Sequence, residues 1–148
     1  TRKESSAASD VYKRQLWSGA DLLPLGVASF GILDGVHMQN HADILPYQML
    51  VDSGRIPWFR AHETTHEERF VREFILRLKL GRVSADYYIQ RYGIDPRSRF
   101  APQLAALTAS GFGSVDGDSI SLTRDGLMQV DRLLHDFFLP QHRDARYT

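Results

Sequence analysis

The stretch TTHEERFVREFILRLKLG, residues 64–81, decides the fold of the second half of the chain. Its apolar residues recur with the spacing of one face of a helix: Phe70, Val71, Phe74, Ile75 and Leu78. The threonines at positions 64 and 65, followed by the glutamates at 67 and 68, have the pattern of a capping box. We therefore predict an amphipathic helix that begins near residue 64 and ends at Gly81.

Beyond this helix, the sequence predicts three further helices and a β-hairpin. Ser84 is the expected N-cap of the second helix, residues 96–110 form the third, and Thr123 is the N-cap of the fourth. The turn Asp116-Gly117-Asp118 separates two short strand-like stretches, which is a hairpin signal. Three helices followed by a hairpin and a helix are the winged-helix layout, so we expect a winged-helix-like domain at residues 61–139.

The first part of the chain carries strand signals instead. Residues Leu22–Phe30, LLPLGVASF, predict a buried strand, and Pro24 places the start of the strand proper near Leu25. Asp34-Gly35 predicts a tight turn before a return strand at residues 36–39. Asn40 is then the expected N-cap of a helix that ends near Asp52. The piece is thus predicted to be strand, turn, strand and helix.

This first piece is too short to bury both faces of its own sheet. We interpret residues 55–63 as a connection between two halves of the chain. We therefore expect residues 16–60 to be the edge of a larger α/β domain. The chain as a whole is assigned to the α+β class, with a domain boundary near residue 60.

Composition narrows the classes of function. The chain has 148 residues, of which 43% are hydrophobic and 24% charged, as in ordinary globular proteins. Its 18 basic and 18 acidic residues give a net charge of zero, which disfavours a strongly basic nucleic-acid-binding protein. No cysteine is present to form a disulfide, a thiolate zinc site or an iron–sulfur ligand set. With no membrane-length apolar run and no signal-peptide pattern, we expect a cytoplasmic protein.

The two ends of the chain are more polar than the rest and have no helix or strand pattern. Residues 1–10 are polar and rich in serine and alanine, which predicts disorder. Residues Ser9–Gln15, SDVYKRQ, also resemble translated sequencing-adapter sequence, so we treat residues 1–15 as a disordered or artefactual tail. After Pro140, residues 140–148 are expected to be a polar tail.

The segment His62-Glu63-Thr64-Thr65-His66 matches the H-E-x-x-H pattern of zinc peptidases. That chemistry needs both imidazoles one turn apart on a helix. Because the capping signal begins at Thr64, His62 precedes the predicted helix and the two rings would not align. We therefore expect no metal site and interpret the segment as a solvated helix start, with zinc binding as the alternative.

The winged-helix layout raises the possibility of DNA binding, but the charged residues of this domain do not favour contact with phosphate. The third helix carries Arg97 and Arg99 at its start and few polar residues after them. The hairpin tip carries Asp116 and Asp118, which would face phosphate with like charge. We expect no nucleic-acid partner, and interpret the domain as one used for packing or as a lid.

Small residues at Gly26–Gly31 let a ligand approach the backbone at the end of a predicted strand. A close-packed turn without a ligand is the equal alternative. His37, Gln39 and Asn40 either line a cavity edge or satisfy the turn and the cap. The sequence has no glycine-rich phosphate loop and no nucleophile elbow, so no catalytic residue is assigned.

Several motifs, in this order and spacing, resemble the oxygen-independent coproporphyrinogen III oxidase family. That family includes radical S-adenosylmethionine (SAM) enzymes and the related heme chaperones. The resemblance covers about residues 16–139. The motifs are LGVASFG at 25–31, GVHMQN at 35–40, DSGRIP at 52–57, ERFVRE at 68–73, YIQRYG at 88–93 and DGDSISLTRDG at 116–126.

The resemblance implies that this chain is the C-terminal portion of a longer protein. The portion would contain the last elements of a radical-SAM (β/α) barrel and the winged-helix-like domain. Upstream, a Cys-x-x-x-Cys-x-x-Cys loop would hold a [4Fe–4S] cluster that cleaves SAM. The intact enzyme would decarboxylate porphyrinogen propionates oxidatively, whereas this portion alone would be inactive.

The same resemblance implies where ligands would lie. Gly26, Ala28, Ser29 and Phe30 are the candidates for cofactor contact, although Ala28 stands where the family often has a second glycine. His37, Gln39 and Asn40 are the weaker candidates for substrate contact, and the partner would be a tetrapyrrole or heme bound through the barrel. The alternatives are a heme-binding chaperone of the same family without oxidase activity and a winged-helix binding module.

Overall fold

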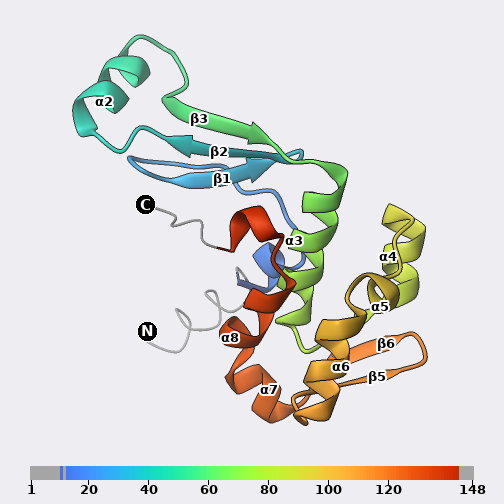
Figure 1. Cartoon of the computed structure of the whole chain (residues 1–148). Coiled ribbons are helices and arrows are strands. Elements are labelled where there is room, and N and C mark those ends of the chain that lie inside the picture. The colour runs from blue at the N-terminus through green and yellow to red at the C-terminus, as the bar shows by residue number, and fades with distance from the viewer. Residues whose placement is uncertain (1–10, 12, 144–148) are drawn as a thin grey trace. The chain divides into compact units, whose positions relative to one another are not determined.

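The computed structural model describes residue 11 and residues 13–143 (Figure 1). Most of the expected tail at residues 1–15 and the last five residues of the expected polar tail lie outside this described part. Residues 13–17, however, are helical. The chain divides into two compact units, residues 20–65 and the remainder, so the division lies after Thr65.

The first unit is a three-stranded antiparallel sheet with one helix. Its elements are β1 (Phe30–Leu33), β2 (Val36–Asn40), α2 (Ile44–Asp52) and β3 (Trp58–Glu63). The strand order is β1-β2-β3. Asp34 and Gly35 both have positive φ, at 47° and 76°, which is what a tight hairpin turn requires at its two central residues. The turn and the return strand predicted from the sequence are confirmed.

The strand predicted at Leu22–Phe30 is wrong, since β1 begins only at Phe30. Leu22 alone bridges the sheet, by two backbone hydrogen bonds to Ile32 at 2.7 and 2.9 Å. A Cβ on Gly31 would lie 2.3 Å from Pro24 Cδ, so the chain crosses over this glycine. The segment before Phe30 is therefore a turn in which Leu23, Leu25 and Val27 are exposed. Local periodicity does not separate such an apolar turn from a short buried strand.

Two other expectations in this unit are corrected. Asn40 ends β2 rather than capping the helix, and the N-cap of α2 is Asp43. The expected connection at 55–63 contains β3, which pairs with β2 from Trp58 to Glu63 with a register shift between Gln39 and Asn40. All six residues of β3 are exposed, so the strand has no alternation of apolar and polar residues to reveal it.

The buried apolar core of the first unit is small. Ile32 and Met38 are its buried hydrophobic residues, and α2 buries none of its side chains. Large hydrophobic side chains are instead exposed at Leu23, Leu25, Val27, Phe30, Leu33, Ile44, Leu45, Met49, Val51, Ile56, Trp58 and Phe59. Such a concentration of exposed apolar surface is typical of a face that another element covers.

The second unit combines helices with a second three-stranded antiparallel sheet, in the order β4-β6-β5. Its first elements are α3 (His66–Leu78), β4 (Arg82–Ser84), α4 (Ala85–Tyr92), α5 (Pro96–Arg99) and α6 (Ala101–Ala109). They are followed by β5 (Gly113–Asp116), β6 (Ser119–Leu122), α7 (Arg124–Met128), α8 (Val130–Leu134), η1 (His135–Phe137) and η2 (Pro140–His142).

The predicted caps at Ser84 and Thr123 and the predicted stop at Gly93 are confirmed. The Ser84 hydroxyl accepts from the amide of Tyr87 at 3.3 Å, and the Thr123 hydroxyl accepts from that of Gly126 at 3.2 Å. Gly93 ends α4 in the left-handed conformation, with φ of 66°. These side-chain caps and the glycine stop satisfy backbone groups that every helix end leaves free.

Two predicted helices are each divided in the structure. Residues 96–110 form α5 and α6, separated at Phe100, where φ is −115°. Pro102 stands in the first turn of α6 and has no amide hydrogen to continue the ladder from α5. The fourth helix is divided at Gln129, whose φ is −117°.

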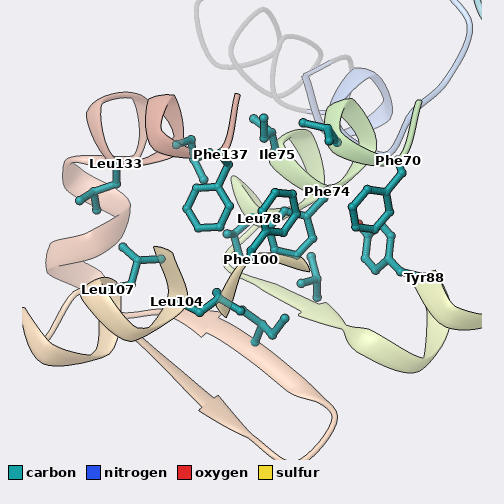
Figure 2. Close-up of a cluster of buried hydrophobic side chains, with 14 of the residues drawn as sticks. Phe70, Phe74, Ile75, Leu78, Tyr88, Phe100, Leu104, Leu107, Leu133 and Phe137 are labelled. Atoms are coloured by element: carbon teal, nitrogen blue, oxygen red, sulfur yellow. The ribbon is translucent and has the colours of Figure 1, made fainter. Parts of the chain in front are cut away.

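The core of the second unit is aromatic and lies on the predicted apolar face of α3 (Figure 2). Phe70 stacks on Phe100 with ring centroids 5.6 Å apart, and Phe74 lies 4.8 Å from Phe100. Tyr88 and Phe137 complete the cluster from α4 and η1. Aromatic pairs at these separations stabilise a core beyond their buried area, by about 0.5–1.5 kcal/mol each.

Candidate functional site

The register of the first sheet brings functional side chains together in two rows. Phe30, Gln39 and Arg60 are direct neighbours across β1, β2 and β3. Ile32, His37 and His62 form the next row. Because alternate residues of a strand point to the same face, these six side chains share one face of the sheet.

The first row contains a hydrogen bond between a buried amide and an exposed guanidinium. Gln39 Oε1 accepts from Arg60 Nε at 2.7 Å. Gln39 is only 6% exposed, so its side chain is held in place by its surroundings. This hydrogen bond fixes the orientation of Arg60, whose side chain otherwise faces outward.

The same face carries aromatic surface. Phe30 is 37% exposed, and its ring centroid lies 6.4 Å from that of the His37 imidazole, at a tilt of 33°. His37 in turn stands opposite His62. The face therefore offers a flat apolar group, two imidazoles and a guanidinium within two strand spacings.

The turn at residues 24–29 holds the other predicted contacts, Gly26, Ala28 and Ser29. The Gly26 amide donates to the Tyr47 hydroxyl at 3.2 Å, and the Ala28 amide donates to the carbonyl of His41 at 2.8 Å. Gly26 and Ala28 both have positive φ, at 94° and 59°. The turn is thus tied to β2 and α2 by its own backbone, and only Phe30 of this predicted group lies on the sheet face.

Asn40 lies beneath this turn rather than on the sheet face. It is 1% exposed, and its Nδ2 donates to the carbonyls of Pro24 and Gly26 at 3.1 and 3.0 Å. Its Oδ1 is buried and has no hydrogen-bond partner among the described residues. Asn40 therefore holds the turn in place, because two loop carbonyls that no strand partner satisfies need a donor.

Sequence reasoning missed Arg60 and His62 as members of this face. The only relevant feature of the sequence is that Arg60 and His62 are two positions apart, as residues on one face of a strand are. This spacing places both side chains on one sheet face only if the segment is a strand that pairs with β2, which the local sequence does not indicate. The two histidines of the H-E-x-x-H pattern do not share a helix, because His62 lies in β3 and His66 begins α3. In the described part of the chain, no group of three acidic, histidine or cysteine side chains is placed to hold a metal ion.

Among the described residues of the second unit, the one buried carboxylate is that of Glu73 on α3, which is 7% exposed. Its oxygens accept from the hydroxyls of Tyr87 and Tyr92 on α4 and form ion pairs with Arg77 at 2.8 Å and Arg91 at 3.2 Å. Burial first, and then the hydrogen bond to Glu73, raise the pKa of both tyrosines. The cluster joins α3 to α4 and leaves the carboxylate fully engaged.

The hairpin tip is also tied down. Asp118 accepts from the Ser84 hydroxyl at 2.7 Å and from the Asp86 amide at the start of α4. These two hydrogen bonds lower the pKa of Asp118. Arg97 pairs with Asp95 at 3.0 Å and donates to the Gly117 carbonyl at 3.0 Å. At the tip, the carboxylate of Asp118 therefore already has hydrogen-bond partners within the unit.

The sequence of this second unit identifies its relatives. Residues 64–128 match the family described as the HemN C-terminal domain. The chain is a HemN-like C-terminal segment. Its resemblance to the oxygen-independent coproporphyrinogen III oxidase family, stated from the motifs, is confirmed.

Curated HemN-like relatives match over both units. The chain is 31% identical over 134 residues to an oxygen-independent coproporphyrinogen III oxidase of Pseudomonas aeruginosa, covering 86% of this chain and 29% of the relative. It is 24% identical over 136 residues to the anaerobic coproporphyrinogen III oxidase 1 of Cereibacter sphaeroides, with the same two shares. The chain thus spans less than a third of the length of these relatives.

A solved structure has the same fold. The Escherichia coli coproporphyrinogen III oxidase HemN, described as a radical SAM enzyme, matches 80% of this chain with a TM-score of 0.70 and 24% identity. The match covers 28% of that protein. The mixed α and β fold of the chain is therefore that of part of HemN.

Proposed function

We propose that this chain is the C-terminal part of a radical-SAM enzyme of porphyrin and heme metabolism, which acts in the cytoplasm. The reaction of the complete enzyme would be the oxidative decarboxylation of porphyrinogen propionates. The observation that carries the proposal is the 31% identity to a coproporphyrinogen III oxidase over 86% of the chain. That similarity extends well beyond the C-terminal domain at residues 64–128 into the unit that holds the sheet face.

Within this proposal, the first unit is the last edge of the (β/α) barrel. The exposed apolar side chains of α2 and β3 support this assignment, since a free-standing unit would bury them. The second unit is a winged-helix-like domain, as its succession of α3, β4, α4, α6, β5 and β6 suggests. The order of the sheet, with β6 between β4 and β5, supports the same assignment.

The cofactors of such an enzyme divide between this chain and the rest of the protein. Iron–sulfur clusters are held by cysteine thiolates, and this chain has no cysteine. Its residues therefore do not hold a [4Fe–4S] cluster, and we assign none of them a step through it. SAM, when bound, supplies the radical that attacks the propionate side chain.

In the complete enzyme, residues of this chain would contact SAM and the tetrapyrrole and shield them from water. Gly26, Ala28 and Ser29 have small or no side chains, so they would allow SAM to approach the turn at van der Waals distance. Because the amides of Gly26 and Ala28 are already engaged, this contact would use surface rather than those donors. Phe30 would cover an apolar part of the ligands, and His37 and Gln39 would face the tetrapyrrole, with Asn40 holding the turn.

The first test is to recover the upstream reading frame from the source DNA. We expect a Cys-x-x-x-Cys-x-x-Cys loop upstream of residue 16 in the same frame. The protein expressed from that longer frame should convert coproporphyrinogen III under anaerobic conditions in the presence of SAM. An upstream frame without the three-cysteine loop would overturn the proposal. A longer protein that binds heme without oxidising coproporphyrinogen III would instead indicate a chaperone.

A further inference from the structure

Arg60 is held in a geometry suited to receiving an anion. Its Nε donates to Gln39 Oε1 at 2.7 Å, and Gln39 is itself more than nine-tenths buried. The two terminal nitrogens of Arg60 make no hydrogen bond or ion pair within the described part of the chain. A guanidinium fixed by its Nε presents a fork of parallel N–H groups, which matches the two oxygens of a carboxylate.

The neighbours of Arg60 on this face favour the same ligand. His62 follows on the same strand and His37 stands opposite it, so basic side chains occupy three of the six positions in the two rows. None of the six positions is an aspartate or a glutamate, and Glu63 falls on the alternate face. Across the sheet from Arg60, the exposed ring of Phe30 supplies a flat apolar surface.

We propose that Arg60, oriented by Gln39, binds a carboxylate of a ligand whose flat apolar part lies against Phe30. The inference rests on the proposed function, which supplies two ligands that carry carboxylates. One is a tetrapyrrole with its propionate side chains, and the other is SAM with its amino-acid carboxylate. Both offer the same group to Arg60, so the experiment must separate them.

The experiment compares acid and ester forms of one porphyrin on the full 148-residue chain. Coproporphyrin III and its tetramethyl ester are titrated while tryptophan fluorescence is followed, because Trp58 lies on β3 two residues from Arg60. SAM and decarboxylated SAM are titrated by calorimetry. The variants are Arg60→Gln, which removes the charge, and Arg60→Lys, which keeps the charge without the fork. Arg55→Gln, an exposed arginine before β3, is the matched control.

We expect Arg60→Gln to weaken coproporphyrin III binding about 10- to 100-fold, the range of a charge-assisted hydrogen bond, and to leave the ester unchanged. Arg60→Lys should fall between, and Arg55→Gln should match the wild type. If the loss appears for SAM and not for coproporphyrin III, the carboxylate belongs to the cofactor and Arg60 keeps its assignment.

Two results would overturn the inference. If the wild type binds coproporphyrin III or SAM and Arg60→Gln binds them equally well, Arg60 is not a carboxylate-binding residue, while the proposed function stands. If the wild type binds neither porphyrin form nor SAM, the inference and the ligand-binding role proposed for this unit fall together. Thermal unfolding of each variant guards against misfolding, and should Arg60→Gln unfold, the titrations of Arg60→Lys decide.

Discussion

Glu73 shows how one buried charge can be stabilised by its partners. Removing a carboxylate from water is costly unless several donors replace its hydration. Here two tyrosine hydroxyls and two arginines supply those donors, all from α3 and α4. The residue therefore acts as a joint between two helices.

We expect Glu73→Gln to lower the free energy of unfolding by about 2 kcal/mol, the scale of a lost charge-assisted hydrogen bond. The physical reason is that the amide loses both ion pairs and leaves Arg77 and Arg91 without their counter-charge. Urea unfolding followed by circular dichroism measures the change. Glu67→Gln is the control, since Glu67 forms an exposed pair with Arg99 that contributes little. Equal effects of the two substitutions would contradict the role given to Glu73.

Gly31 illustrates a second constraint at single-residue scale. Its φ is not positive, so backbone conformation does not require glycine there. What requires it is space, because an added Cβ would lie 2.3 Å from Pro24 Cδ and 2.5 Å from the Leu22 carbonyl oxygen.

Gly31→Ala should therefore push residues 22–24 away from β1 and break the bridge between Leu22 and Ile32. Faster amide hydrogen exchange at Leu22 and Ile32 would report this loss. Gly54→Ala is the matched control, because no atom lies within 4 Å of a Cβ there, although its positive φ adds its own strain. Unchanged exchange at both amides in Gly31→Ala would contradict the packing argument.

At the scale of elements, the β5–β6 hairpin and α4 stabilise each other through Asp118. Its carboxylate accepts from the Ser84 hydroxyl and the Asp86 amide, and its backbone carbonyl accepts from the Ala85 amide at 2.8 Å. A carboxylate at this position also complements the positive end of the helix dipole. The hairpin thus supplies a helix cap from 34 residues away.

The hydrogen bonds at Asp118 predict a pH dependence. Its pKa in the folded state is lowered below the ordinary 3.8. The unfolded chain therefore binds a proton first as pH falls, so this contribution is present above about pH 4 and is lost as pH falls through the folded pKa. Asp118→Asn should lower stability at neutral pH and flatten the acid limb of a stability–pH curve measured by urea unfolding.

Asp116→Asn is the matched control, since Asp116 lies at the same hairpin tip in β5 without those hydrogen bonds. It should leave both the stability and the slope near the wild-type values. A curve for Asp118→Asn that keeps the wild-type slope would show that the cap does not form in solution.

At the scale of the whole molecule, the two units differ in how much they bury. Among the described residues, the second unit has a core of sixteen buried hydrophobic residues, five of them aromatic, whereas Ile32 and Met38 are the buried hydrophobic residues of the first. Local opening is easiest where few apolar contacts must be broken. No helix in the described part of the chain is long and apolar enough to cross a membrane.

We therefore expect amides in residues 30–63 to exchange with solvent faster than those of α3 and β6, by native-state hydrogen exchange with mass spectrometry. In the longer protein proposed above, protection of residues 30–63 should rise, because the apolar side chains of α2 and β3 would be covered. If amides of residues 30–63 in this chain were as strongly protected from exchange as those of α3, the small core of the first unit would not limit its stability.

Signals that act within a few residues could be predicted from the sequence alone. The Asp34-Gly35 turn, the Ser84 and Thr123 caps and the apolar face of α3 all follow from backbone conformation and helical period, which adjacent residues decide. The family was likewise recognisable, because short motifs keep their order and spacing along a chain.

Only the tertiary structure decided how distant segments pair. Residues 58–63 became a strand because β2 offered a free edge, and this pairing placed Arg60 beside Gln39 and His62 opposite His37. Asn40 is buried and does not cap a helix, because its side-chain amide donates to two loop carbonyls that need a donor. Such choices depend on which partner satisfies a backbone or side-chain group across the fold, and that partner is not written in the neighbouring sequence.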